Sequence, residues 1–309
     1  MSEQLNTIQD FASKLRSKKT GTGQPNELKV DPHFEEDPEA AKVIEFAIKR
    51  RKNLLLVGPT GCGKSSLAIN VMARLKETAE IFSCDGETCT DNLIGKPWAI
   101  IDDKGKGKTV VAPGAALRAY KEGKILLLEE VDHAIPDILA SLHRIMETQS
   151  EFYISNIGDE EVIQKHRDFS VIATANTIGT GEDTYLYAGT KPLNMAFMNR
   201  FSLTFRMGYI DKSREIKVLK NRTGIDDTIA QKIVYTANDA RDASDPSRIN
   251  GAPGSAKLGA TISTRDTIEW ADAIVGMSLE PVKAAEYAFL NRISEIDRDV
   301  IRTMITNRF

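Results

Sequence analysis

The chain has 309 residues, 41% of them hydrophobic and 28% charged, which predicts an ordinary globular protein with two domains. A formal net charge of −3 excludes a bulk electrostatic attraction to nucleic acid or to a membrane surface. The N-terminal segment has no apolar signal core, and no run reaches the ~18 apolar residues of a membrane span. We therefore expect a cytoplasmic protein that does not contact a membrane.

The three cysteines, Cys62, Cys84 and Cys89, are too few and too irregularly spaced for a disulfide framework. No second pair accompanies Cys84 and Cys89, so a zinc site is not expected. The cysteine pattern favours a reducing, intracellular environment.

Residues 1–35 are mostly polar and predict a short helix followed by a flexible N-terminal extension. Asp37-Pro38 then predicts a helix start, with Asp as the N-cap and Pro at the first helical position. A short apolar run follows at residues 53–57. It does not alternate with polar residues, which is typical of a strand that is buried on both faces of a parallel sheet.

Similar apolar runs recur along the next part of the chain, and helical patterns separate most of them. This alternation predicts an α/β fold, an αβα parallel-sheet core over residues 36–208. From residue 209 the pattern changes to amphipathic helices, broken by a polar loop at 239–259. Residues 209–309 are therefore predicted to form a C-terminal helical lid domain.

The strongest motif begins where the run 53–57 ends. Its spacing is Gly-x4-Gly-Lys-Ser, and it lies between a predicted buried strand and a predicted helix, as a phosphate-binding loop requires. Glycines let the backbone wrap a phosphate, and N–H groups at a helix start favour anions. We expect ATP here, with Lys64 on the β- and γ-phosphates and the Ser65 hydroxyl on Mg²⁺. The predicted nucleotide-binding residues are Gly58, Pro59, Thr60, Gly61, Cys62, Gly63, Lys64, Ser65 and Ser66.

Two adjacent carboxylates end the apolar run that begins at Ile125. We predict that Glu129 contributes to the Mg²⁺ site and that Glu130 polarises the attacking water. Asp is usual at the first position, and the extra methylene of Glu129 is expected to alter the metal geometry. The alternative is a pair of solvated acids at the exit of a strand.

Three further polar residues are candidates for the reaction. Asn176 ends the apolar run 170–175 and can orient water against the γ-phosphate, although a simple turn Asn is the alternative. Arg265 lies in the first turn of a predicted helix capped by Ser263, where a cation is disfavoured unless it faces an anion. Arg200 precedes the last predicted strand of the core. Either arginine can stabilise a transferred phosphoryl group, in cis or from a neighbour, or serve only as a surface ion-pair residue.

Taken in order, several stretches resemble the MoxR branch of AAA+ ATPases, and within it the CobS-like small ATPase subunits of cobaltochelatase. These stretches are 91–95, 127–132, 173–177, 186–189, 194–201, 263–265 and 270–271. The resemblance implies a homo-oligomeric ring, usually a hexamer, with ATP between subunits. It also implies that Arg200 is an arginine finger donated in trans and that Arg265 senses the nucleotide in cis.

The same resemblance implies that residues 151–165 form an insert hairpin facing the pore or top of the ring. Partners of this family commonly carry a von Willebrand A domain, as the CobT-like subunit of cobaltochelatase does. We expect the ATPase to remodel such a partner or to drive a chelatase-type complex. The alternatives are a true cobaltochelatase subunit, a nucleic-acid-dependent motor, and a non-catalytic scaffold gated by nucleotide. The basic run 104–108 is the only support for the motor and is interpreted as a solvated hairpin. The alternative is a pore-facing loop that grips a substrate, with Trp98 as a hydrophobic contact.

Overall fold

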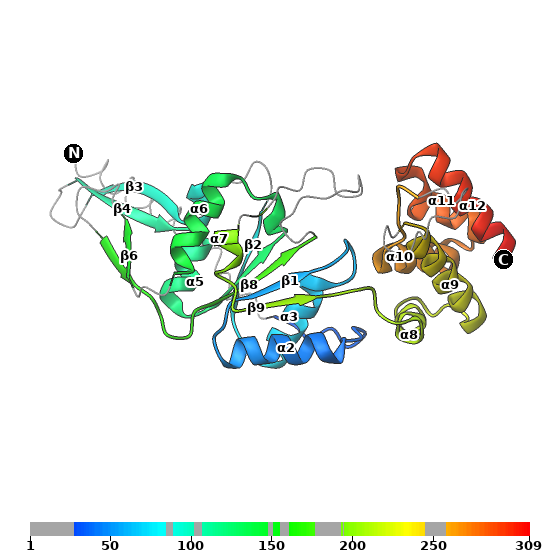
Figure 1. Ribbon diagram of the computed structural model, residues 1–309, viewed down its shortest axis with the longest axis horizontal. Coiled ribbons are helices and arrows are strands. Elements are labelled where there is room, and N and C mark those ends of the chain that lie inside the picture. Colours follow the sequence, from blue (N-terminus) through cyan, green and yellow to red (C-terminus); the bar gives the residue numbers. More distant parts are fainter. Residues whose placement is uncertain are drawn as a thin grey trace, which may run out of the picture.

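A computed structural model describes residues 28–84, 89–101, 107–147, 151–154, 161–176, 193, 195–244 and 258–309. Figure 1 shows a sheet with helices around it and a separate group of helices at the C-terminal end. The predicted αβα parallel-sheet core and the helical C-terminal region are therefore both present. Residues 186–189 and Asn194, which contribute to the family resemblance, lie outside the described residues.

The core sheet has five strands in the order β2-β5-β8-β1-β9, and every neighbouring pair is parallel. Its central strands β1, β5 and β8 are mostly apolar and are buried on both faces up to Glu129, the half-buried last residue of β5, as the non-alternating runs predicted. The strands are β1 (Leu54–Val57), β2 (Ala79–Ser83), β5 (Ile125–Glu129), β8 (Ser170–Ala175) and β9 (Leu203–Arg206).

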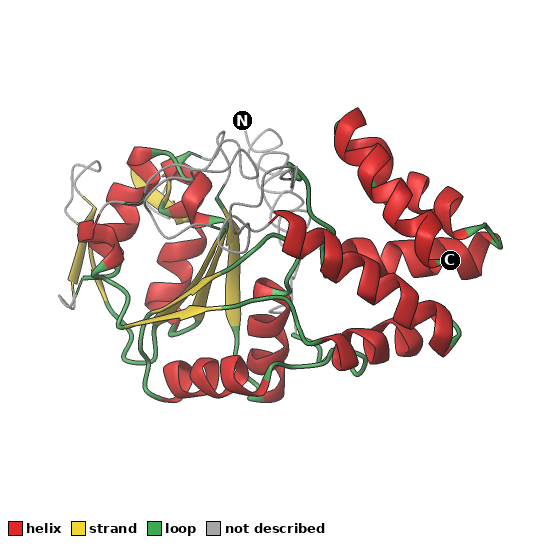
Figure 2. Cartoon of the chain, turned by 45° about the vertical axis from the view of Figure 1, so that its right-hand side comes forward, coloured by secondary structure: helices red, strands yellow, loops and turns green. Residues whose placement is uncertain are grey.

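Helices cover both faces of this sheet (Figure 2). Leu54 and Leu56 pack with α2 and α3 on one face, whereas Leu55 and Val57 pack with α5 and α6 on the other. The α2 helix begins as predicted, because the Asp37 carboxylate accepts a hydrogen bond from the Ala40 N–H at 2.8 Å. The helices are α2 (Pro38–Lys49), α3 (Lys64–Arg74), α5 (Ala115–Glu122), α6 (Pro136–Ile145) and α7 (Met195–Met198).

Two antiparallel hairpins extend the core. The first pairs β3 (Gly95–Ile101) with β4 (Gly107–Pro113) and follows the short helix α4 (Thr90–Leu93). Of the run 104–108 that was predicted as a solvated hairpin, Gly107 and Lys108 begin β4, and residues 102–106 lie outside the described residues. The second pairs β6 (Glu151–Ile154) with β7 (Glu161–Gln164), which is the insert hairpin that the family resemblance implies.

The C-terminal region has its own hydrophobic core around Trp270, which is fully buried and donates a hydrogen bond to the Pro281 carbonyl at 2.8 Å. The loop predicted at 239–259 is wrong for its first part, and residues 245–257 lie outside the described residues. Its first residues continue a helix to Ser244, because Ala240 and Arg241 are buried against the rest of the lid. The elements are α8 (Lys212–Thr223), α9 (Asp227–Ser244), α10 (Thr264–Met277), α11 (Pro281–Ala288), the 3-10 helix η3 (Leu290–Arg292) and α12 (Glu295–Arg308).

A buried ion pair joins three segments of this lid. The Arg241 guanidinium donates two hydrogen bonds of 2.7 Å to the Glu215 carboxylate and a third of 2.7 Å to the Ile262 carbonyl. The Thr267 hydroxyl donates to the same carboxylate at 3.0 Å. Because Glu215 is 0% exposed, any loss of its partner leaves a buried charge without compensation.

Replacing Arg241 by alanine is therefore expected to lower the free energy of unfolding of the lid by about 3–5 kcal/mol. Urea unfolding followed by Trp270 fluorescence in a Trp98→Phe background measures it. The double variant Glu215→Leu with Arg241→Met is the control, and it should lose less than Arg241→Ala because it removes both charges. A loss below about 1 kcal/mol for Arg241→Ala would contradict the assignment.

Candidate nucleotide-binding site

The glycine-rich loop, Glu130 and Asn176 converge at one edge of the sheet. The carboxyl ends of β1 and β8 are level, since Val57 pairs with Ala175. The glycine-rich loop follows β1, Glu130 follows β5 and Asn176 follows β8. In parallel sheets this edge is where ligands bind, so the topology brings together three stretches that are far apart in the sequence.

The loop is built for close approach of an anion. Gly61 and Gly63 have φ values of +72° and +92°, a backbone conformation that favours glycine. The α3 helix begins directly at Lys64, and its N-cap Gly63 offers no side-chain hydrogen bond to the first turn. The N–H groups of that turn therefore stay available to an anion at the positive end of the helix dipole.

Lys64 is directed into this loop. Its ammonium group donates hydrogen bonds to the Gly58 carbonyl (2.7 Å), the Pro59 carbonyl (3.0 Å) and the Asn176 amide oxygen (2.9 Å). Burial lowers the pKa of Lys64, while the neighbouring Cys62, Asp132 and Glu130 oppose this shift. A buried cation held only by neutral oxygens is well suited to exchange them for a phosphate.

Glu130 occupies a strained turn directly after β5. Its φ of +55° is in the left-handed region, which a non-glycine residue seldom adopts, and its N–H donates to the Thr174 hydroxyl at 3.1 Å. This side chain is exposed, whereas Glu129 is half-buried at the end of the strand. Backbone strain held in place by a buried hydrogen bond is typical of a functional residue.

Asp132 lies among the candidate site residues, although it was not predicted as one of them. It lies in the 3-10 helix η1 (Val131–His133), is 0% exposed, and accepts a hydrogen bond from the Asn176 N–H at 2.8 Å. Lys64, Asn176 and Asp132 therefore form one continuous set of contacts. The feature of the sequence that could have indicated this residue is its position at the end of the Glu-Glu-Val-Asp run, residues 129–132.

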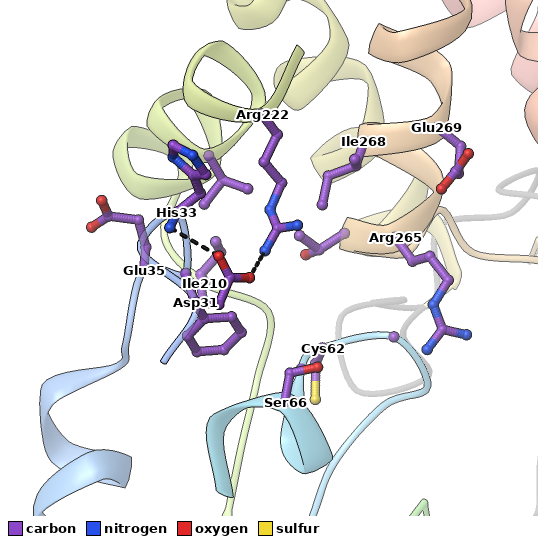
Figure 3. Close-up of a pocket in the computed structure, with 15 residues that line it drawn as sticks. Asp31, His33, Glu35, Cys62, Ser66, Ile210, Arg222, Arg265, Ile268 and Glu269 are labelled. Atoms are coloured by element: carbon purple, nitrogen blue, oxygen red, sulfur yellow. Dashed lines mark hydrogen bonds and ion pairs between the residues drawn. The ribbon is translucent and has the colours of Figure 1, made fainter. Parts of the chain in front are cut away.

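A cavity of about 340 Å³ lies beside the loop, between the core and the lid (Figure 3). Apolar side chains from four segments line part of it, namely Phe34, Ile210, Val218 and Ile268. Cys62 and Ser66 border it from the loop, and burial raises the pKa of the Cys62 thiol. A cavity of this size with apolar walls next to an anion site suits a nucleoside joined to phosphates.

One wall of this cavity comes from residues 31–35, the last part of the predicted extension. Asn70 of α3 fixes this segment, because its amide accepts from the Asp31 N–H and donates to the Glu36 carboxylate, both at 2.8 Å. An ion pair between Asp31 and Arg222 joins the segment to α8 across the cavity (Figure 3). No residue of this segment was predicted as a site residue, since these contacts link residues far apart in the chain.

Arg265 brings the lid to the phosphate loop. Ser263 caps α10 as predicted, in a capping box with Asp266, so Arg265 lies in the first turn. A Cβ added to Gly61 would lie 2.6 Å from the Ser263 side chain and 3.8 Å from the Arg265 Cβ. Arg265 is exposed and lines the cavity, as Figure 3 shows, so a cation from the lid faces the anion site.

Arg200 lies at the opposite edge of the sheet. The amide of Asn53, the residue before β1, donates to the Arg200 carbonyl at 3.0 Å, and Leu203 pairs with Leu54. The phosphate loop follows the other end of β1. The whole length of that strand therefore separates Arg200 from the loop of its own chain.

Mg²⁺ is usually held by one or two carboxylates together with substrate phosphates and water, rather than by a cage of protein ligands. The described residues contain no group of three or more His, Cys, Asp or Glu side chains arranged to hold a metal. An oxygen-only set of Ser65 and Glu129 is chemically suited to Mg²⁺ bound together with a triphosphate. Within the described ranges, no helix has the length and apolar character needed to cross a membrane.

The strand order, the glycine-rich loop and the helical lid define a P-loop nucleotide-binding ATPase with a C-terminal helical domain. Two family profiles agree with this class. The AAA domain of the dynein-related subfamily matches residues 53–201, and the C-terminal domain of CbbQ, NirQ and NorQ matches residues 215–306. The chain therefore belongs to the AAA+ ATPases of the MoxR type.

Individual relatives agree with the family. The chain is 27% identical to the aerobic cobaltochelatase subunit CobS of Sinorhizobium sp. over 275 residues, 88% of this chain and 80% of that protein. It is 31% identical to an uncharacterised protein of Staphylococcus saprophyticus over 191 residues, 62% of this chain and 68% of that protein. It is 28% identical to one of Staphylococcus haemolyticus over 260 residues, 84% of this chain and 91% of that protein.

Proposed function

We propose that this chain hydrolyses ATP in a ring of identical subunits and uses the energy to remodel a protein partner. The observation that carries the proposal is the separation of its charged groups. Lys64, Glu130 and Asn176 meet at one edge of the sheet, while Arg200 lies at the other. A complete site then needs a second copy of the chain.

In this proposal the phosphates displace the carbonyl and amide oxygens that now surround the Lys64 ammonium. The backbone N–H groups of the loop, from Gly58 to Ser66, bind the triphosphate, and the apolar wall of the cavity holds the base. Asn176 orients the attacking water, and the Glu130 carboxylate accepts its proton. Arg265 adds positive charge to the phosphates from the lid of the same chain.

Ser65 and Glu129 would hold Mg²⁺, which when bound supplies charge neutralisation to the β- and γ-phosphates. Arg200 of the adjoining subunit stabilises the charge that develops on the transferred phosphoryl group. An arginine finger of this kind accelerates hydrolysis by roughly 10³–10⁵-fold. Each chain alone is therefore nearly inactive.

Complementation between two inactive variants tests this arrangement. Lys64→Ala removes the phosphate contact but keeps Arg200, whereas Arg200→Ala removes the finger but keeps the phosphate loop. Each variant alone is expected to be inactive. In an equal mixture roughly a quarter of the sites combine an intact loop with an intact neighbouring finger, so ATPase activity should return to about that fraction of the parent.

Steady-state hydrolysis of Mg·ATP measures the recovery. Mixing each variant with buffer alone controls for dilution, and a mixture of Lys64→Ala with Lys64→Ala/Arg200→Ala controls for new contacts. If the equal mixture stays inactive although both variants assemble, Arg200 does not act from a neighbour.

For the partner, we propose a CobT-like protein with a von Willebrand A domain, because the family resemblance implies one. The relative from Sinorhizobium supports a second candidate, a true cobaltochelatase subunit. The 27% identity makes the general partner class the preferred proposal. The hairpin β6–β7, which projects from the core in Figure 1, is the proposed contact for that partner.

A further inference from the structure

Three side chains form a small charged cluster around Arg200. The Arg200 Nη2 atom donates to the Glu147 carboxylate at 3.3 Å, and His143 Nδ1 lies 3.9 Å from the same oxygen. His143 lies on α6, and Glu147 lies four residues later, just beyond the end of that helix, while Arg200 follows α7. A single carboxylate oxygen therefore faces one nitrogen from α6 and one from another part of the core.

The cluster is incomplete within the chain. Arg200 Nε and His143 Nε2 are both buried and have no hydrogen-bond partner in the described ranges. Their side chains are nevertheless 33% and 31% exposed, so the cluster lies at the molecular surface. Buried polar atoms without partners at a surface indicate a face that another molecule completes.

The backbone and the side chain of Arg200 are held separately. Asn53 fixes the backbone by accepting from the Val171 N–H (3.1 Å) and donating to the Arg200 carbonyl (3.0 Å). Glu147 is the only described group with a recorded ion pair to the guanidinium. An ion pair this exposed contributes little to folding stability, so its main effect is to restrict the orientation of a long side chain.

Glu147 also adjoins the insert hairpin. Lys165, which follows β7, donates from its ammonium group to the Glu147 carbonyl at 3.1 Å. Glu147 therefore contacts the Arg200 guanidinium through its carboxylate and the Lys165 ammonium, next to the hairpin, through its carbonyl. A displacement of the hairpin would change the position of Glu147.

We propose that Glu147 is a positioning residue for Arg200, holding its guanidinium so that it enters the active site of the neighbouring subunit already oriented. Only one of the guanidinium nitrogens contacts Glu147, which leaves other donors for the γ-phosphate. The inference rests on the proposed function, because it assigns a neighbour to the proposed finger.

The test places Glu147→Ala in one member of the complementing pair at a time. The Lys64→Ala chain supplies the intact Arg200 of each active site, so there Glu147 contacts the working finger. The Arg200→Ala chain supplies the intact phosphate loop and has no finger for its Glu147 to contact. We expect the kcat of the mixed ring to fall about tenfold in the first arrangement, below the roughly hundredfold effect of a misplaced catalytic group. In the second arrangement we expect no change.

The KM for ATP should stay the same in both arrangements. In the first, the nucleotide is bound by the other chain, and in the second, Glu147 lies beside position 200, at the opposite end of β1 from the loop that binds the nucleotide. Glu147→Gln keeps an acceptor oxygen and is expected to retain more activity than Glu147→Ala. Glu122→Gln, an exposed acid of α5, is the control and should behave as the parent pair. Thermal unfolding of each variant shows whether it folds, and Glu147→Gln replaces Glu147→Ala if the latter does not.

An equal fall in both arrangements, no fall in either, or a rise in kcat would overturn the inference. A failure of the parent pair to complement has a different meaning, since it overturns the proposed action of Arg200 itself. The two failures are therefore distinguishable in one experiment.

Discussion

Glu130→Gln is expected to bind ATP as tightly as the parent protein and to hydrolyse it about 10²–10⁴-fold more slowly. Glutamine keeps the shape of the side chain but cannot accept the proton of the attacking water. Binding is preserved because Lys64 and the loop N–H groups stay in place. Equilibrium binding of ATP and steady-state turnover, measured on the same preparation, separate the two effects.

Glu39→Gln, which changes an exposed acid in the first turn of α2, is the matched control and should leave both quantities unchanged. Turnover at the parent rate by Glu130→Gln would remove Glu130 from the mechanism. If the chain remodels a partner as proposed, the slowed protein is expected to hold that partner longer. Recovery of a protein with a von Willebrand A domain on the ATP-loaded variant supports remodelling, whereas ATP-dependent cobalt insertion into a corrinoid precursor supports the cobaltochelatase alternative.

Lys64→Ala is expected to weaken ATP binding at least about 100-fold and to abolish turnover. The ammonium group makes charge-assisted hydrogen bonds with phosphate oxygens, each contributing roughly 1.5–3 kcal/mol, and alanine makes none. Isothermal titration with ATP measures the change. The fold itself should persist, since removing Lys64 also removes a partly desolvated charge.

Lys42→Ala changes an exposed lysine of α2 and controls for the loss of one positive charge. It should bind ATP like the parent. If Lys64→Ala keeps the parent affinity, the glycine-rich loop is not the phosphate site, and the proposed function fails with it.

The features that sequence reasoning reached are those encoded locally. The glycine-rich spacing, the apolar runs and the Ser263 cap each occupy a few consecutive residues, so their chemistry can be read directly. The convergence of Glu130 and Asn176 on Lys64 was also predictable, because parallel strands bring their carboxyl ends to one edge.

The features that it missed depend on contacts between distant segments. Asp31 faces Arg222, 191 residues away, and neither has a local pattern that indicates a cavity wall. Asp132 acquires its place only when β5 and β8 are adjacent. The end of α9 was missed for the same reason. Arg241 lies in a polar stretch of the sequence, and it is buried because it forms an ion pair with Glu215, which is distant in the chain.

Tyr209, in the segment that joins the sheet to α8, gives the lid a way to respond to the loop. Its hydroxyl donates to the Thr60 carbonyl at 3.2 Å, and its ring lies 4.0 Å from the Arg241 guanidinium carbon. One aromatic side chain thus stands between the phosphate loop and the ion pair at the centre of the lid. Tyr209 therefore links the backbone of the glycine-rich loop directly to the buried ion pair of the C-terminal domain.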